Sequence, residues 1–281
     1  MEVLMSSRRH ELTDMEWQLL KQVLPTGRPG PVRKDDRRIM NGIFFVLRSG
    51  IPWRDLPERY GPYTTCFNRY NRWSKDGTWA RMMEDLLSLA RGDDDDDPDG
   101  DGSSRLEVRM MDSSGVRVHK HGAGSRRDGE PREMGKSRAG LTTKVHVMTD
   151  GNATPVALHL TPGHRADCTQ AGRLLSELPP GATVIADKAY GSDDILNRIK
   201  AVNGRVAIPP KANRKKPWVI DMTLYKSRNR IERFFGLIKE FRRVATRYDK
   251  RARNYLSTVM LTVTRYLLRK IARLQIIEST P

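Results

Sequence analysis

The segment from Tyr225 to Lys239 combines one carboxylate with several cations on a helical pattern of apolar residues. At about 100° per residue, Tyr225, Arg228, Glu232 and Lys239 would fall within about 60° of one another on a continuous helix. An isolated Arg228–Glu232 surface pair would contribute only about 0.2–0.5 kcal/mol to the stability of that helix. The segment therefore becomes a candidate for catalysis only if other carboxylates come near it.

Two other carboxylates stand where core strands are expected to reach the surface. Asp112 follows the alternating apolar run 106–111, and Asp187 follows the apolar run 183–186. A single Asp at a strand end is commonly a turn or capping residue. Three acids in this order, on a chain this basic, favour a catalytic role for Asp112, Asp187 and Glu232.

Three carboxylates gathered in one place predict a divalent metal. Two unit charges about 4 Å apart repel by roughly 4 kcal/mol at an effective dielectric near 20. Oxygen ligands favour Mg²⁺, with Mn²⁺ as a substitute. Two such ions could activate an attacking oxygen and stabilise the departing one in an in-line displacement at phosphorus. Arg228 and Lys239 would then be placed for nearby phosphates.

The N-terminal part of the chain predicts four short helices, over residues 12–24, 35–48, 63–75 and 78–90. In the third of these, Thr65, Arg69 and Arg72 would face outward. Such an arrangement suits a helix-turn-helix-like DNA-binding domain over residues 1–91. The alternative is an ordinary helical bundle with a polar exposed side. Residues 92–104 contain no apolar side chain and predict an acidic linker.

Strands are expected from residue 105 onward. The pattern gives strands at 105–119, 140–149 and 154–161, a helix at 165–178, a strand at 183–186, a helix at 192–202 and a strand at 205–208. The helix with Glu232 follows, and a basic region ends in a helix over 253–277. This order predicts an α/β, RNase H-like catalytic domain with a mixed β-sheet over residues 105–281.

The composition points to a polyanionic partner. The chain has 281 residues, a formal net charge of +17 and a pI near 10.2. No apolar run approaches the roughly 18 residues of a membrane span, and the N-terminus lacks the pattern of a signal peptide. We therefore expect a nucleic-acid partner, no membrane attachment, and a cytoplasmic, nucleoid-associated location.

The sequence resembles the bacterial insertion-sequence transposases of the DDE type, and among them the IS-five group. Those proteins carry a Tyr, Arg, Glu, Lys signature with two, three and six intervening residues, which Tyr225, Arg228, Glu232 and Lys239 reproduce. Further similar segments are 47–57, 61–65, 140–146, 186–192 and 242–254.

The resemblance implies a DNA transposase with a defined site. Asp112, Asp187 and Glu232 would bind two Mg²⁺ ions, the enzyme would cut at terminal inverted repeats, and the freed 3′-OH would attack target DNA. We expect a homo-oligomer on double-stranded DNA. The predicted DNA-binding side chains are Tyr225, Arg228, Lys239, Lys188, Arg242, Arg243, Arg247, Lys250, Thr65, Arg69 and Arg72. The alternatives are a stand-alone nuclease on the same fold and a non-catalytic DNA-binding relative.

Overall fold

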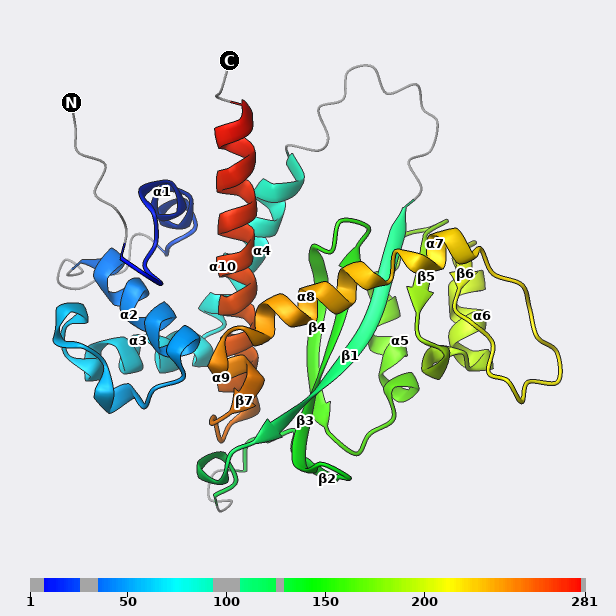
Figure 1. The fold of residues 1–281 in the computed structure, drawn as a ribbon, viewed down its shortest axis with the longest axis horizontal. Coiled ribbons are helices and arrows are strands. Elements are labelled where there is room, and N and C mark those ends of the chain that lie inside the picture. The colour runs from blue at the N-terminus through cyan, green and yellow to red at the C-terminus, as the bar shows by residue number, and fades with distance from the viewer. Residues whose placement is uncertain (1–7, 26–34, 93–106, 125–128, 279–281) are drawn as a thin grey trace. The chain divides into compact units, whose positions relative to one another are not determined.

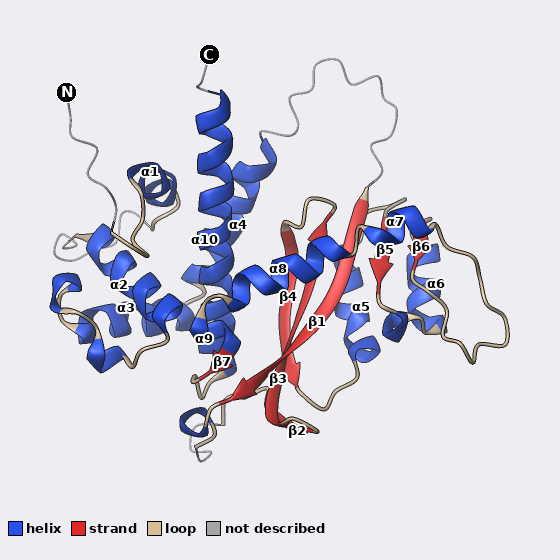
Figure 2. Ribbon diagram, viewed as in Figure 1, coloured by secondary structure: helices blue, strands red, loops and turns tan. Residues whose placement is uncertain are grey.

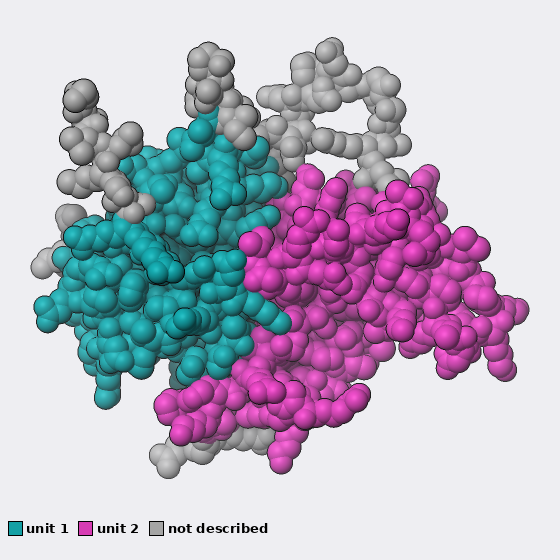
Figure 3. Space-filling view, viewed as in Figure 1, with its two compact units in different colours: residues 1–97, 238–281 teal, residues 98–237 magenta. Residues whose placement is uncertain are grey.

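A computed structural model describes residues 8–25, 35–92, 107–124 and 129–278. The chain forms two compact units. Unit 1 comprises residues 1–97 together with 238–281, and unit 2 comprises residues 98–237 (Figure 3). Unit 1 is mostly helical and unit 2 contains the main sheet, as the colouring in Figure 2 makes plain.

The N-terminal part of unit 1 contains four helices, as the sequence predicts. Helix α1 begins with a capping box: Thr13 Oγ1 accepts from the Glu16 N–H, and the Glu16 carboxylate accepts from the Thr13 N–H. Gly50 ends α2 in the left-handed conformation that favours glycine. The four helices are α1 (Asp14–Gln22), α2 (Asp36–Ser49), α3 (Tyr63–Lys75) and α4 (Thr78–Gly92).

The C-terminal segment completes the same unit. It contains α9 (Arg242–Ala245), β7 (Thr246–Arg247) and the long helix α10 (Ala252–Glu278). Helix α10 packs against α1, α2, α3 and α4, and its Leu267 and Leu268 are fully buried. The sequence-based division placed this segment in the domain over 105–281. It groups instead with the N-terminal helices, because their apolar faces are covered by the apolar face of α10.

Unit 2 is built on a mixed sheet with strand order β2-β3-β1-β5-β6, and β4 also pairs with β3. Strand β3 pairs antiparallel with both β1 and β4, whereas β5 pairs parallel with β1 and β6 pairs parallel with β5. This is the strand order of an RNase H-like fold, as predicted. The strands are β1 (Val108–Val118), β2 (Gly135–Ser137), β3 (Gly140–Asp150), β4 (Pro155–Pro162), β5 (Thr183–Ala186) and β6 (Arg205–Ala207).

Helices cover the two faces of this sheet differently. On one face, Met111 and Met148 pack into an apolar core with Leu174 and Ile195, which belong to α5 (Ala171–Leu174) and α6 (Asp193–Ala201). On the other lie α7 (Met222–Lys226) and α8 (Asn229–Lys239), and α8 crosses the strands in Figure 1. Since side chains alternate along a strand, Asp112 faces opposite to Met111 and therefore toward α8.

Three predicted elements differ from the structure. The helix predicted over 165–178 is a series of short turns around α5, where Thr169 and Ser176 hydroxyls donate to backbone carbonyls. The single helix predicted across Tyr225–Lys239 is interrupted between α7 and α8, where the Ser227 hydroxyl donates to the Leu224 carbonyl. Short strand β2 was not predicted and lies between the predicted strands over 105–119 and 140–149.

Two other expectations concern the acidic linker and membrane-spanning helices. Apart from Gly92, the predicted acidic linker lies outside them. None of the helices in the described ranges combines the length and apolar character that a bilayer crossing requires.

Candidate active site

Two of the three predicted acids are brought together by strand register. Strands β1 and β5 pair in parallel, with Met111 opposite Ala186. Asp112 is the next residue of β1, and Asp187 is the residue that directly follows β5. The two therefore stand side by side where β5 ends. The antiparallel pairing of Asp112 with Val147 on β3 fixes the other side of β1. The backbone carrying Asp112 is therefore held by ladders on both sides.

Local hydrogen bonds orient both aspartates. Asp187 Oδ1 accepts from the Ala189 N–H at 2.8 Å, capping a short turn that follows β5. Asp112 Oδ1 accepts from the Ser113 N–H at 2.8 Å. Burial raises the pKa of the Asp112 carboxyl; the Ser113 N–H and Arg228 act against that rise, and the Asp187 and Glu232 carboxylates add to it. The surroundings of Asp112 therefore favour its protonated form more than water does.

The third acid reaches the same place from α8 through one arginine. Arg228 Nη1 donates to Glu232 Oε1 at 2.7 Å. Its Nη2 lies 3.9 Å from Asp112 Oδ2 and 3.7 Å from Asp187 Oδ2. The Arg228 side chain is 15% exposed and that of Glu232 is 55% exposed. One guanidinium thus contacts all three predicted acids, which come from three separate elements.

The three carboxylates are the right donors for a hard divalent cation, although Arg228 stands among them. Among the described residues, no three His, Cys, Asp or Glu side chains are already grouped closely enough to share an ion. The Arg228 Nε is buried and has no hydrogen-bond partner in the described part of the chain. The donor set fits Mg²⁺, which prefers carboxylate oxygens.

Other predicted residues of unit 2 lie at this site. Burial raises the pKa of the Tyr225 hydroxyl, with Arg228 opposing and the Asp187 and Glu232 carboxylates reinforcing that rise. Tyr225 therefore lies within the electrostatic reach of the acids. Lys188 directly follows Asp187 and is exposed.

The remaining predicted DNA-binding residues belong to unit 1 and fall into two groups. Lys239 is partly exposed, and the exposed members are Thr65, Arg72, Arg242 and Lys250. The other three are buried: Arg69 is 9% exposed, Arg243 is 8% exposed and Arg247 is fully buried.

The three buried arginines have partners within the protein, so the structure corrects their predicted role. Arg69 pairs with Asp36 at 2.7 Å, Arg243 donates to the Ile51 carbonyl, and Arg247 donates to the Asp249 carbonyl. Each guanidinium also lies over an aromatic ring, of Trp73, Tyr248 and Tyr255 respectively. Their contacts are those of structural residues.

A fourth acid near the site, Asp167, was not predicted from the sequence. Asp167 Oδ1 accepts from Ser113 Oγ at 2.7 Å and from Lys144 Nζ at 2.8 Å. Because Ser113 is adjacent to Asp112, this arrangement supports the acid from the opposite face of the sheet. Its only sequence signal would have been the alternation along β1, which turns Ser113 away from Asp112.

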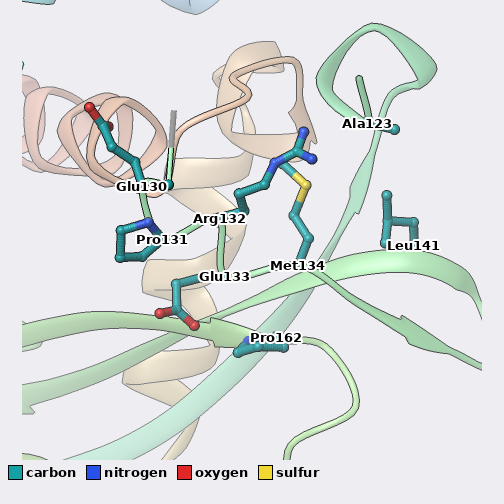
Figure 4. Close-up of a pocket in the computed structure, with 9 residues that line it drawn as sticks. Ala123, Glu130, Pro131, Arg132, Glu133, Met134, Leu141 and Pro162 are labelled. Carbon is teal, nitrogen blue, oxygen red and sulfur yellow. The ribbon is translucent and has the colours of Figure 1, made fainter. Parts of the chain in front are cut away.

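A separate cavity of unit 2, of about 540 Å³, is distinct from the three acids (Figure 4). It lies beside the loop that precedes β2. Its lining includes Glu130, Arg132, Glu133, Met134, Leu141 and Pro162. Its carboxylates and guanidinium are not those of the acid cluster.

Two family models match the chain. The model described as "Transposase DDE domain" matches residues 103–267, and that described as "Putative transposase of IS4/5 family" matches residues 12–83. The first covers more than half of the chain and contains all three acids.

Several known proteins are similar over parts of the chain. The putative transposase for insertion sequence element IS6501 of Brucella ovis is 39% identical over 131 residues, which is 46% of this chain and 100% of that protein. The putative transposase for IS402 of Burkholderia cepacia is 31% identical over 141 residues, 46% of this chain and 64% of that protein. A crystal structure of the Mos1 Strand Transfer Complex aligns with a TM-score of 0.32 and 13% identity, over 88% of this chain and 78% of that one.

Proposed function

This chain belongs to the family of transposases that carry a DDE domain, and we propose that it cuts DNA at the terminal inverted repeats of its element and joins the 3′-OH ends to target DNA. The observation that supports this most directly is the gathering of Asp112, Asp187 and Glu232 around one cationic group. Such a site suits reaction at a phosphodiester, because metal ions held by carboxylates can stabilise the charge that develops on the attacking and departing oxygens.

We propose that these three acids hold two Mg²⁺ ions, with Mn²⁺ as a substitute. Their oxygens fit such ions. Burial raises the pKa of Asp112 and the Asp187 and Glu232 carboxylates add to that rise, so a bound cation would favour the ionised form. When bound, the ions would supply Lewis-acid stabilisation of both reacting oxygens. The strand ladders and the Ala189 N–H fix the aspartates in advance, which reduces the reorganisation that binding requires.

Cations and hydroxyls of each unit would hold the DNA. In unit 2, Lys188 and Tyr225 would contact phosphates beside the acids. In unit 1, the exposed side chains of Thr65 and Arg72 on α3, and those of Arg242 and Lys250, would contact a duplex. The substrate is double-stranded DNA, and we propose a homo-oligomer that acts on the nucleoid in the bacterial cytoplasm.

The direct test is the full-length Asp187→Asn variant on a duplex from the DNA that flanks the gene. Removing one carboxylate should lower strand cleavage by at least about 10²-fold, the scale of losing one electrostatic stabiliser. Binding to the same duplex in metal-free buffer should stay nearly unchanged. The matched control is Asp194→Asn, because Asp194 is exposed and pairs only with Arg198 among the described residues. Retained cleavage by Asp187→Asn would remove this acid from the site.

Strand joining needs a separate assay. A duplex with a pre-cut 3′-OH end should be joined to target DNA by the wild-type chain and by Asp194→Asn, and not by Asp187→Asn. Cleavage without joining would instead indicate a stand-alone nuclease on the same fold.

A further inference from the structure

Arg228 differs from its neighbouring arginines in what it contacts. Its guanidinium lies within 4 Å of all three acids, at 2.7, 3.7 and 3.9 Å. Arg230 instead donates to the Gly151 carbonyl, and Arg233 donates to the Asn229 side chain. Of these three arginines, Arg228 is the one that contacts the acid cluster.

The guanidinium neutralises the acids only in part. Three carboxylates and one guanidinium carry −3 and +1, a net charge of −2, in a site where Arg228 is 15% exposed and Asp112 is 18% exposed. Only Glu232 lies at hydrogen-bond distance, and the two aspartates are 3.7 and 3.9 Å away. The buried Nε lacks an acceptor among the described residues. A cation that coordinates the oxygens directly can therefore replace these long contacts.

We propose, on the basis of the function proposed above, that Arg228 is the counter-cation of the metal-free site and is displaced when metal binds, which frees its guanidinium for a DNA phosphate. Charge disfavours a site that holds both the metal ions and the Arg228 guanidinium. Two divalent ions with three carboxylates carry +4 and −3, a net charge of +1, which repels a nearby guanidinium. A phosphate brings negative charge and the bidentate geometry that arginine prefers.

This exchange makes metal and DNA binding cooperative through one residue. Metal binding must break the contacts of Arg228 with the acids, and this cost weakens the metal affinity of the DNA-free chain. Once displaced, the guanidinium gains a phosphate partner, so metal raises DNA affinity. By linkage, DNA raises metal affinity by the same factor.

The first measurement is Mn²⁺ binding to the DNA-free, full-length protein by titration calorimetry. Arg228→Gln should bind Mn²⁺ at least about threefold more tightly than wild type, because a competing unit charge has been removed. Arg233→Gln is the matched control: it makes the same change of charge at an exposed residue within α8 and should bind Mn²⁺ as wild type does. If Arg228→Gln binds Mn²⁺ no more tightly than Arg233→Gln, the proposal is overturned.

A second variant keeps the test decisive if Arg228→Gln does not fold. Arg228→Lys retains the charge and loses the planar fork, so its Mn²⁺ affinity should exceed that of wild type by a smaller factor. Far-UV circular dichroism and a cooperative unfolding transition establish which variants are folded. An Arg228→Lys affinity below that of wild type would contradict the competition.

The second measurement is binding to a short mixed-sequence duplex with and without Ca²⁺. Calcium should tighten DNA binding by wild type and Arg233→Gln, and by a clearly smaller factor for Arg228→Gln. An equal gain in all three proteins would overturn the transfer of Arg228 to phosphate. Asp187→Asn separates this inference from the proposed function. If that variant binds Mn²⁺ as wild type does, the metal assignment itself fails; if only the Arg228 comparisons fail, the metal site stands without the exchange.

Discussion

Single residues on the sheet face opposite α8 hold Asp112 in place. Asp167 accepts from both Ser113 and Lys144, and the Lys144 and Asp167 side chains are 22% and 24% exposed. Asp167→Ala would leave both donors without this acceptor, so the free energy of unfolding should fall by about 1.5–3 kcal/mol, the range for hydrogen bonds to charged groups. Denaturant titration measures this loss. The exposed control Asp194→Ala should stay within about 0.5 kcal/mol of wild type; equal stability of both variants would contradict the supporting role of Asp167.

Two stacked histidines on β3 and β4 predict a dependence of stability on pH. The rings of His146 and His159 are 4.8 Å apart and buried. Burial lowers the pKa of each from 6.5 to about 4. The unfolded chain therefore takes up protons at these positions before the folded chain does. The free energy of unfolding should decrease as pH falls from about 6.5 to about 4, and the stability that the neutral pair contributes is present above that window.

Chemical unfolding across that pH window tests the histidine pair. His159→Gln should flatten the slope of unfolding free energy against pH, since one of the two groups no longer titrates. Parallel slopes for wild type and His159→Gln would show that the pair is not responsible.

At the scale of elements, two glycines predict opposite effects of the same substitution. Gly50 ends α2 at φ +78°, and an added Cβ would lie 2.8 Å from Arg242 Cβ. Gly50→Ala should lower the unfolding free energy by about 1–2 kcal/mol. Gly236 lies within α8 with no atom within 4 Å of an added Cβ, so Gly236→Ala should raise it by about 0.5–1 kcal/mol. Thermal or denaturant unfolding of both variants would contradict this reasoning if the signs were the same.

Elements with strong local signals could be predicted from the sequence. Helix α3 has the predicted bounds of 63–75, and the Thr13 and Glu16 pair marks the start of α1. The breaks around α5 and between α7 and α8 could not be predicted, because serine and threonine hydroxyls there bond to the backbone in competition with the helix. Apolar periodicity does not register such bonds.

The candidate site was predictable to a different extent for each residue. Asp112 and Asp187 could be placed because each follows an apolar strand pattern, and parallel register then makes them neighbours. Asp167 could not be found, since its partners Ser113 and Lys144 come from other strands. The basic composition predicted cations on DNA, but it does not distinguish exposed Arg72 from Arg69.

At the scale of the molecule, the formal charge of +17 predicts DNA binding that weakens steeply with salt. Arg72 is exposed on α3, so Arg72→Gln should reduce the slope of log affinity against log salt concentration by about 1. Arg69→Gln should leave the slope unchanged and lower stability, because Arg69 is buried against Asp36. Fluorescence anisotropy with a labelled duplex over a KCl series measures the slopes. A smaller slope for Arg69→Gln would return that residue to the DNA surface.

Unit 1 is assembled from both ends of the chain, which has a consequence for biosynthesis. Helices α1 to α4 leave the ribosome before unit 2, yet α10, which covers their apolar faces, is translated after it. The N-terminal helices therefore wait for the whole of unit 2 to be made before they can bury those faces, and a prematurely terminated product would present them to chaperones and proteases. Only a polypeptide that extends through α10 would acquire a complete unit 1.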